Sequence, residues 1–163
     1  MTRIYLPATA ADLAELRASG GLPVTDAYAV TDALRAELAA AGETDEESCE
    51  YTALVSAAHA SLFRLAELPG AAARRIVVAA DVEPGAVREV ASGLVEVTAP
   101  VTVKAVASVH VDGDGPEVAR LVAAAIAEIG DGEVSETTAD SLDGHDLEWY
   151  APSELGDLVD SLS

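Results

Sequence analysis

The chain has 163 residues, of which 50% are apolar and 4% aromatic, and it carries 9 lysine and arginine residues against 29 aspartate and glutamate residues. This length predicts a single domain over residues 1–163, because such a chain can bury about two thirds of its unfolded surface without disulfides or metal. The formal charge of -20 repels phosphate backbones and anionic lipid surfaces, which argues against nucleic acid and membranes as partners.

Two strand-and-helix pairs are predicted at the start of the chain. Residues 3–7 predict a short strand, and residues 9–20 predict a helix in which Thr9 is the N-cap. Residues 27–30 predict a second strand, and the helix predicted after it covers residues 31–42. The chain therefore begins with two units in which a strand precedes a helix.

The middle of the chain holds the longest predicted helix and a buried strand. Thr44 and Glu47 form a capping box, and apolar residues at helical spacing continue from there to Pro69. Residues 74–82 contain a continuous apolar run from Ile76 to Ala80, which is typical of a strand covered on both faces. We predict that this segment is the central strand.

Valine-rich segments follow, and their pattern leaves two interpretations open. Residues 87–97 predict one or two short strands, broken at residues 92–93. Residues 101–111 alternate as a single strand would. A turn around Lys104, with the strand limited to residues 106–111, fits the pattern almost as well.

The last third of the chain predicts two more helices, a weak segment and a final strand. Pro116 opens a helix over residues 117–129, which carry an amphipathic stripe. Residues 133–144 are polar and predict a loop or one weak helix. Residues 146–151 predict the last strand, and Pro152 starts a terminal helix.

This order of elements predicts the fold class. Strands that alternate with helices, with one strand apolar throughout, favour an α/β fold with a mixed or mostly parallel sheet of about five strands covered by helices. The alternative is an α+β fold with its helices on one face of the sheet.

Cysteine content and the first residues predict the compartment. Cys49 is the lone cysteine, and the chain has no CxxC or Cys/His cluster for zinc or an iron–sulfur centre. The chain lacks an apolar stretch of about 18 residues and a basic, then apolar, leader. We therefore expect a cytoplasmic protein. Its acidity reflects either ordinary solubility in a high-GC genome or adaptation to high salt, and we favour the first because the charges occupy ordinary helix and loop positions.

Four segments, taken in order, resemble a known family. They are residues 3–9 (RIYLPAT), 74–82 (RRIVVAADV), 106–113 (VASVHVDG) and 145–155 (HDLEWYAPSEL). Together they resemble an uncharacterised actinobacterial family of small acidic proteins, a domain of unknown function, over most of the chain. The resemblance implies a cytoplasmic bacterial protein and supplies no activity, cofactor or site.

Two histidine-and-carboxylate groups lie where we expect strands to end. His110 and Asp112 are two residues apart on one face of a predicted strand, and Asp114 follows on a glycine turn. His145 and Asp146 precede the last predicted strand. If these strands are neighbours, their imidazole and carboxylate groups could converge on a divalent metal.

The same residues have an ordinary structural explanation, which we favour. Aspartate and glycine are common turn residues, and a chain with 29 acids places some of them near a histidine by chance. The segment from Asp112 to Glu117 also departs from the calcium-loop pattern. We therefore predict no resident cofactor, with a divalent metal as the alternative.

Other motifs give weaker signals. Arg74 and Arg75 could bind an anion, although such a pair more often answers nearby acids at the start of a strand. Trp149 and Tyr150 form the one adjacent aromatic pair; we expect one ring to pack in the core and the other to reach the surface as a partner contact. Glycine-rich motifs for nucleotides and the hydrolase nucleophile motif are absent from the sequence.

These observations favour a binding role over an enzymatic one. The leading hypothesis is a non-enzymatic interaction or accessory protein, whose acidic surface suits a basic protein partner or a homo-oligomer. The alternative is a metal-dependent enzyme or sensor that uses the His110/Asp112 and His145/Asp146 strand ends.

Overall fold

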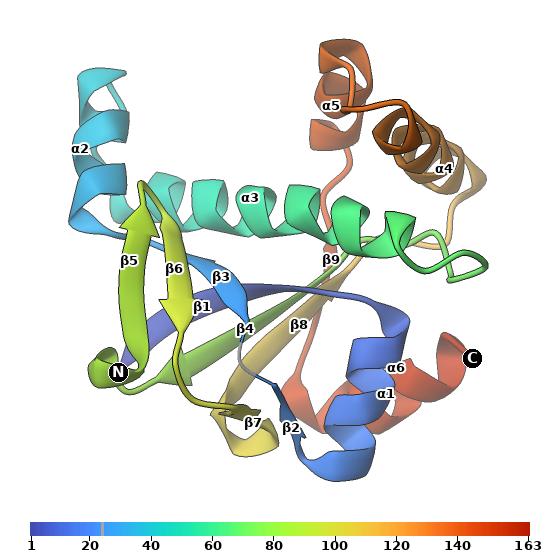
Figure 1. Ribbon diagram of the computed structural model, residues 1–163, viewed down its shortest axis with the longest axis horizontal. Coiled ribbons are helices and arrows are strands. Elements are labelled where there is room, and N and C mark those ends of the chain that lie inside the picture. Colours follow the sequence, from blue (N-terminus) through green and yellow to red (C-terminus); the bar gives the residue numbers. More distant parts are fainter. Residues whose placement is uncertain (24) are drawn as a thin grey trace.

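The protein is built around one large sheet. The computed structural model describes residues 1–23 and 25–163, and Figure 1 shows a central sheet with helices on both of its sides. In spatial order its strands are β5 (Val87–Ala91), β6 (Leu94–Val97), β3 (Asp26–Ala29), β1 (Thr2–Ala8), β4 (Ile76–Val82), β8 (Val106–Val111) and β9 (Glu148–Tyr150). A separate short pair is formed by β2 (Gly21–Leu22) and β7 (Val101–Thr102). The helices are α1 (Ala10–Ser19), α2 (Asp32–Ala40), α3 (Glu46–Ala66), α4 (Pro116–Gly130), α5 (Glu136–Asp143) and α6 (Leu155–Ser161).

The direction of the strands corrects the predicted fold class. Every neighbouring pair in the seven-stranded sheet of the described residues is antiparallel. The expected α/β fold with a mixed or mostly parallel sheet of about five strands is therefore wrong. The α+β alternative fits as a class, although the helices pack on both faces of the sheet and not on one face as that alternative expected.

The connections after β1 and β8 explain why alternating elements do not produce parallel pairs. Tyr5 of β1 pairs with Tyr28 of β3, so β3 starts at the end of the sheet where β1 finishes. Likewise, the last residue of β8, Val111, pairs with the first residue of β9, Glu148. The intervening helices lead away and return to the same end, whereas a parallel neighbour requires a crossover to the opposite end.

The long helix α3 makes the one full crossover that affects the site. Its 21 residues span about 31 Å, enough to carry the chain from one end of the sheet to the other. As a result β3 and β4 run in the same direction, since both are antiparallel to β1. They do not pair because β1 lies between them.

The alternation of side chains along β1 and β4 divides the core into two layers. Ile4, Leu6 and Val78 face the layer of α1 and α6, where they pack against four leucines: Leu13, Leu16, Leu155 and Leu158. Tyr5 and Val77 face α3. The residues of α3 that meet the sheet are the small Ala53, Ala57 and Ala58, which let the helix lie close to the strands.

A third apolar cluster holds α4 and α5 on α3 rather than on the sheet. Leu62 and Leu65 of α3 pack against Val118 and Val122 of α4 and Leu142 of α5. In Figure 1, α4 and α5 lie beyond the α3 side of the sheet. This arrangement leaves the segment from α5 to β9 to form one wall beside α3.

Of the described helices, none is both long enough and apolar enough to cross a membrane.

Several open predictions are settled by the structure. Val103–Ala105 form a 3-10 turn at Lys104, so β8 is limited to Val106–Val111. The segment over residues 87–97 forms two strands, and residues 136–143 form a helix. The long helix begins one residue later than the predicted capping box implies, because its N-cap is Asp45, which accepts a hydrogen bond from the Ser48 amide.

Candidate functional site

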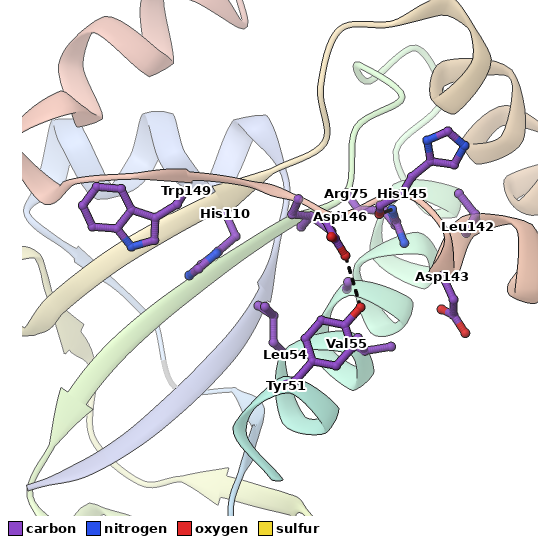
Figure 2. Close-up of a pocket in the computed structure, with 12 residues that line it drawn as sticks. Tyr51, Leu54, Val55, Arg75, His110, Leu142, Asp143, His145, Asp146 and Trp149 are labelled. Carbon is purple, nitrogen blue, oxygen red and sulfur yellow. Dashed lines mark hydrogen bonds between the residues drawn. The ribbon is translucent and has the colours of Figure 1, made fainter. Parts of the chain in front are cut away.

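A cavity of about 320 Å³ lies between α3 and the β8–β9 edge of the sheet. Figure 2 shows Tyr51 on α3, Arg75, His110 and Trp149 on the sheet side, and Asp146 on the segment that leads into β9. We call this cavity the α3–β9 cleft and define it by these five residues. It is open to solvent at one side, because Tyr51, Asp146 and Trp149 are exposed.

Periodicity places the lining side chains. Tyr51, Leu54, Val55 and Ala58 lie on one face of α3, which is the spacing that brings helical side chains together. On β8, His110 alternates with Val109 and Val111, which enter the opposite core layer.

Strand register completes this arrangement. Val77, His110 and Trp149 are direct neighbours across β4, β8 and β9, so their side chains share the α3 face of the sheet. Trp149 therefore stands beside His110 at the edge of the sheet (Figure 2).

A buried ion pair closes the inner end of the cleft. Arg75 and Asp112 are almost fully buried, with Arg75 Nε 2.9 Å from Asp112 Oδ2 and Arg75 Nη2 2.7 Å from Asp112 Oδ1. The Arg75 backbone amide also donates to Asp112 Oδ2 at 2.8 Å, and Nη2 donates to the His145 carbonyl oxygen at 3.0 Å. Arg75 thus joins the end of β8 to the chain that leads into β9.

A second polar contact ties α3 to the opposite wall. The Tyr51 hydroxyl donates to Asp146 Oδ1 at 3.2 Å, drawn as the dashed line in Figure 2. Partial burial, followed by the hydrogen bond and negative charge of Asp146, raises the pKa of the Tyr51 phenol. The hydroxyl therefore stays protonated and remains a donor.

The structure brings together three of the five residues predicted as metal ligands. His110, His145 and Asp146 all line the cleft. Their side chains do not converge: in Figure 2 the His145 ring points away from His110, while Asp146 points toward Tyr51.

The other two predicted ligands lie outside this arrangement. Both oxygens of Asp112 are hydrogen-bonded to Arg75, and Asp114 is solvent-exposed with the Arg74 guanidinium 4.0 Å away. Within residues 1–23 and 25–163, no group of three or more His, Cys, Asp or Glu side chains is placed to hold a metal ion. A metal at these strand ends stays a prediction, and it would require Asp112 to leave Arg75.

Metal addition tests that prediction directly. Because Asp112 is already paired, we expect zinc, manganese, magnesium and calcium each to leave the thermal unfolding midpoint of metal-stripped protein unchanged. A metal at 100 times its dissociation constant would add about 2.7 kcal/mol to the native state, which a thermal melt detects. A rise specific to one metal, lost in His110→Ala or His145→Ala, would contradict this expectation.

The predicted aromatic pair separates into one outward and one inward ring. Trp149 is 62% exposed at the mouth of the cleft. Tyr150 is half-buried against the α1 and α6 layer, and its hydroxyl donates to Glu148 Oε2 at 3.1 Å. Successive strand residues point to opposite faces, so only Trp149 is presented to the cleft.

Two contributors to the cleft were missed in the sequence. Tyr51 lies at helical spacing with the apolar residues of the long helix, and nothing in that pattern distinguishes it from a core residue. Arg75 was expected to answer nearby acids, and it does so by pairing with Asp112, 37 residues away. The one signal available was an arginine at the start of a strand and an aspartate at the end of another.

His110 is held as a neutral ring by its surroundings. Its Nε2 lies 2.9 Å from the Ser108 hydroxyl oxygen. Burial first, and then the positive charge of Arg3, lower the pKa of His110 below its ordinary value of 6.5. At neutral pH the ring therefore adds no positive charge to the cleft.

This lowered pKa predicts a pH-dependent stability. Below about pH 6.5, His110 is protonated in the unfolded chain but stays largely neutral in the native state. The unfolded state then binds more protons, so the free energy of unfolding decreases as the pH is lowered. When the pH is lowered from 7.5 to 5.5, we expect the free energy of unfolding, measured in urea, to decrease less in His110→Gln than in the natural chain. The exposed His59, changed to Gln, is the control, and an unchanged pH dependence in His110→Gln would contradict the expectation.

Comparisons with known proteins give one match. Residues 2–159 match the model of a family of unknown function. Searches of curated proteins and of solved structures found no match. The resemblance to a domain of unknown function is thus confirmed over nearly the whole chain, and the actinobacterial origin stays a prediction.

Proposed function

This chain belongs to the family of unknown function DUF6912, and from that premise, which brings no activity with it, we propose that the protein is a non-enzymatic interaction protein. In this proposal the α3–β9 cleft is its binding surface. We also propose a cytoplasmic location, because a lone cysteine suits a reducing compartment. We propose a protein partner, because a formal charge of -20 disfavours nucleic acids and anionic membranes.

The observation that carries the proposal is exposed aromatic surface around a concavity. Trp149, the lone tryptophan of the chain, is 62% exposed, and Tyr51 on the facing helix is 48% exposed. Tryptophan and tyrosine in such positions are the side chains that most often dominate binding energy at protein interfaces. Leu54 and Val55 extend this surface into the cleft.

The polar groups of the cleft support binding rather than catalysis. Arg75 is neutralised by Asp112, and the Asp146 carboxylate accepts a hydrogen bond from Tyr51. The nearest approach to a catalytic pair is Ser108 and His110. Ser108, however, is almost fully buried, and no carboxylate of the described residues hydrogen-bonds His110 to orient it as a base.

The proposal is tested by selecting ligands on the protein. A displayed random-peptide library would be panned on the natural chain and on a Tyr51→Ala/Trp149→Ala double variant. We expect peptides to be enriched on the natural chain and lost on the double variant, because removing two exposed aromatic rings removes the centre of the surface.

A matched control separates the cleft from exposed aromatic surface in general. Phe63, also on α3, is 42% exposed and does not line the cleft, so Phe63→Ala is expected to enrich the same peptides as the natural chain. Equal enrichment on the natural chain and the double variant would refute the cleft as the binding surface.

A further inference from the structure

We propose that the α3–β9 cleft receives an arginine side chain of the partner protein, with the guanidinium held by Tyr51 and the Asp146 carboxylate and the flanking residues of the segment passing over Trp149. This inference rests on the proposed function and deepens it by naming the chemistry of the occupant. It is argued from the charge, the shape and the lining of the cleft.

The charge balance of the cleft is negative. Its buried cation, Arg75, is matched by Asp112, while Asp143 and Asp146 remain at the mouth. The His110 ring is neutral at neutral pH because its pKa is lowered. The third basic residue of the described lining, His145, turns its ring away from the tyrosine and the tryptophan (Figure 2). An entering anion would meet two carboxylates, whereas a cation would be attracted.

The negative charge continues beyond the cleft. A shallower hollow of about 250 Å³ shares Tyr51, His110 and Trp149 with the cleft and adds Glu47 and Glu50. The arginine that borders this hollow, Arg3, is paired with Asp81 at 2.6 Å. The backbone that flanks an inserted side chain would therefore also cross an acidic surface, which suits a basic segment of a protein.

The lining matches the two parts of an arginine side chain. Leu54, Val55 and Leu147 offer apolar surface for its aliphatic stem. Tyr51 offers an aromatic face on which a planar guanidinium stacks, and guanidinium is more weakly hydrated than ammonium. Trp149 lies on the other side of His110 in Figure 2, where it can contact the flanking residues of the segment. Tyr51 uses only Oδ1 of Asp146, so Oδ2 can accept from the guanidinium.

The size of the cleft fits one side chain. At about 320 Å³ it is at the lower end of the range for ligand cavities, which is roughly 300–1,000 Å³. A cavity of this size holds a long side chain and is too small for a folded element. The occupant must therefore be presented on an extended or protruding segment.

The test uses Trp149 as its own reporter, since it is the one tryptophan in the chain. Its fluorescence would be titrated with a capped Ala-Arg-Ala peptide and with the same peptide carrying citrulline, lysine or norleucine. Citrulline keeps the shape of arginine and removes the charge. We expect the arginine peptide to bind at least about tenfold more tightly than the citrulline and norleucine peptides, and more tightly than the lysine peptide.

Two variants test the carboxylate. Asp146→Asn is expected to weaken binding of the arginine peptide about tenfold while keeping an acceptor for Tyr51. Asp157→Asn on α6, which packs on the opposite face of the sheet, removes the same charge and is expected to leave binding unchanged. Equal thermal midpoints would show that both variants are folded.

The outcomes separate this inference from the proposed function. Binding of citrulline or norleucine as tight as arginine, or of lysine tighter than arginine, would overturn the inference and leave the cleft as a binding surface. Agmatine carries a guanidinium group without a peptide backbone, and we expect it to bind more weakly than the arginine peptide. Tighter binding of agmatine would overturn the inference that the ligand is a protein segment and would indicate a small amine instead. Failure of both the arginine peptide and the library to bind would refute the proposed function itself.

Discussion

Asp112→Ala is expected to lower the free energy of unfolding by about 3–5 kcal/mol, because it leaves the Arg75 guanidinium buried without its counter-charge. Both side chains are almost fully buried, and Asp112 accepts three hydrogen bonds from Arg75. Urea unfolding at neutral pH measures the loss. We also expect the segment at His145 to loosen, since Arg75 is the donor to its carbonyl oxygen.

Two controls give this prediction its meaning. Arg75→Met/Asp112→Leu removes both charges together and is expected to recover most of the loss, because no unpaired charge is then buried. The pair of Arg88 and Glu96 is solvent-exposed, so Glu96→Ala is expected to cost less than about 1 kcal/mol. A similar small cost for Asp112→Ala would contradict the structural role assigned to the buried pair.

Ser61→Ala is expected to lower the free energy of unfolding by about 1–3 kcal/mol, because it removes a buried hydrogen-bonding group from two backbone partners. The Ser61 hydroxyl donates to the Ala8 carbonyl oxygen at 2.7 Å and accepts from the Ile76 amide at 3.2 Å. Through these bonds α3 is attached to the end of β1 and the start of β4, beside the strand residue that follows Arg75. Urea unfolding measures the loss, and hydrogen exchange at the Ile76 amide reports it locally.

The matched control lies in the same helix. Ser56 is half-buried and has no side-chain hydrogen bond among the described residues, so Ser56→Ala is expected to change stability by less than about 0.5 kcal/mol. Equal effects at Ser56 and Ser61 would show that the bridge to β1 and β4 contributes nothing beyond ordinary helix substitution.

These two contacts also explain why the cleft has a defined shape. Ser61 positions α3 on the sheet, and Arg75 positions the chain that enters β9. The walls that carry Tyr51 and Trp149 are therefore held by buried polar bonds rather than by contacts between the walls alone. Binding measurements on Asp112→Ala should show a weakened site even though Asp112 does not line the cleft.

The kind and place of most elements could be predicted from local pattern. The apolar run from Ile76 to Ala80 is a central strand, and the helical spacing after Thr44 is the longest helix. Where two patterns fitted almost equally, as around Lys104, the choice depended on pairing with β4 and could not be made locally.

The candidate site was predicted only in part, for the same reason. Histidines and acids near strand ends drew attention to His110, His145 and Asp146, and all three line the cleft. Their interpretation as ligands depended on where Asp112 pointed, and its partner, Arg75, is distant in sequence. Tyr51 could not be distinguished from a core residue, because helical periodicity does not show which residues of α3 the sheet covers.

The sequence by itself determined most of the element types, the acidic charge and the presence of one exposed ring in the Trp149–Tyr150 pair, because these follow from composition and from local periodicity. The tertiary structure alone decided the strand directions, the Arg75–Asp112 pair and the placement of Tyr51 and Trp149 around one cleft. These features depend on where each connection returns the chain to the sheet, and that is set by packing between segments far apart in sequence.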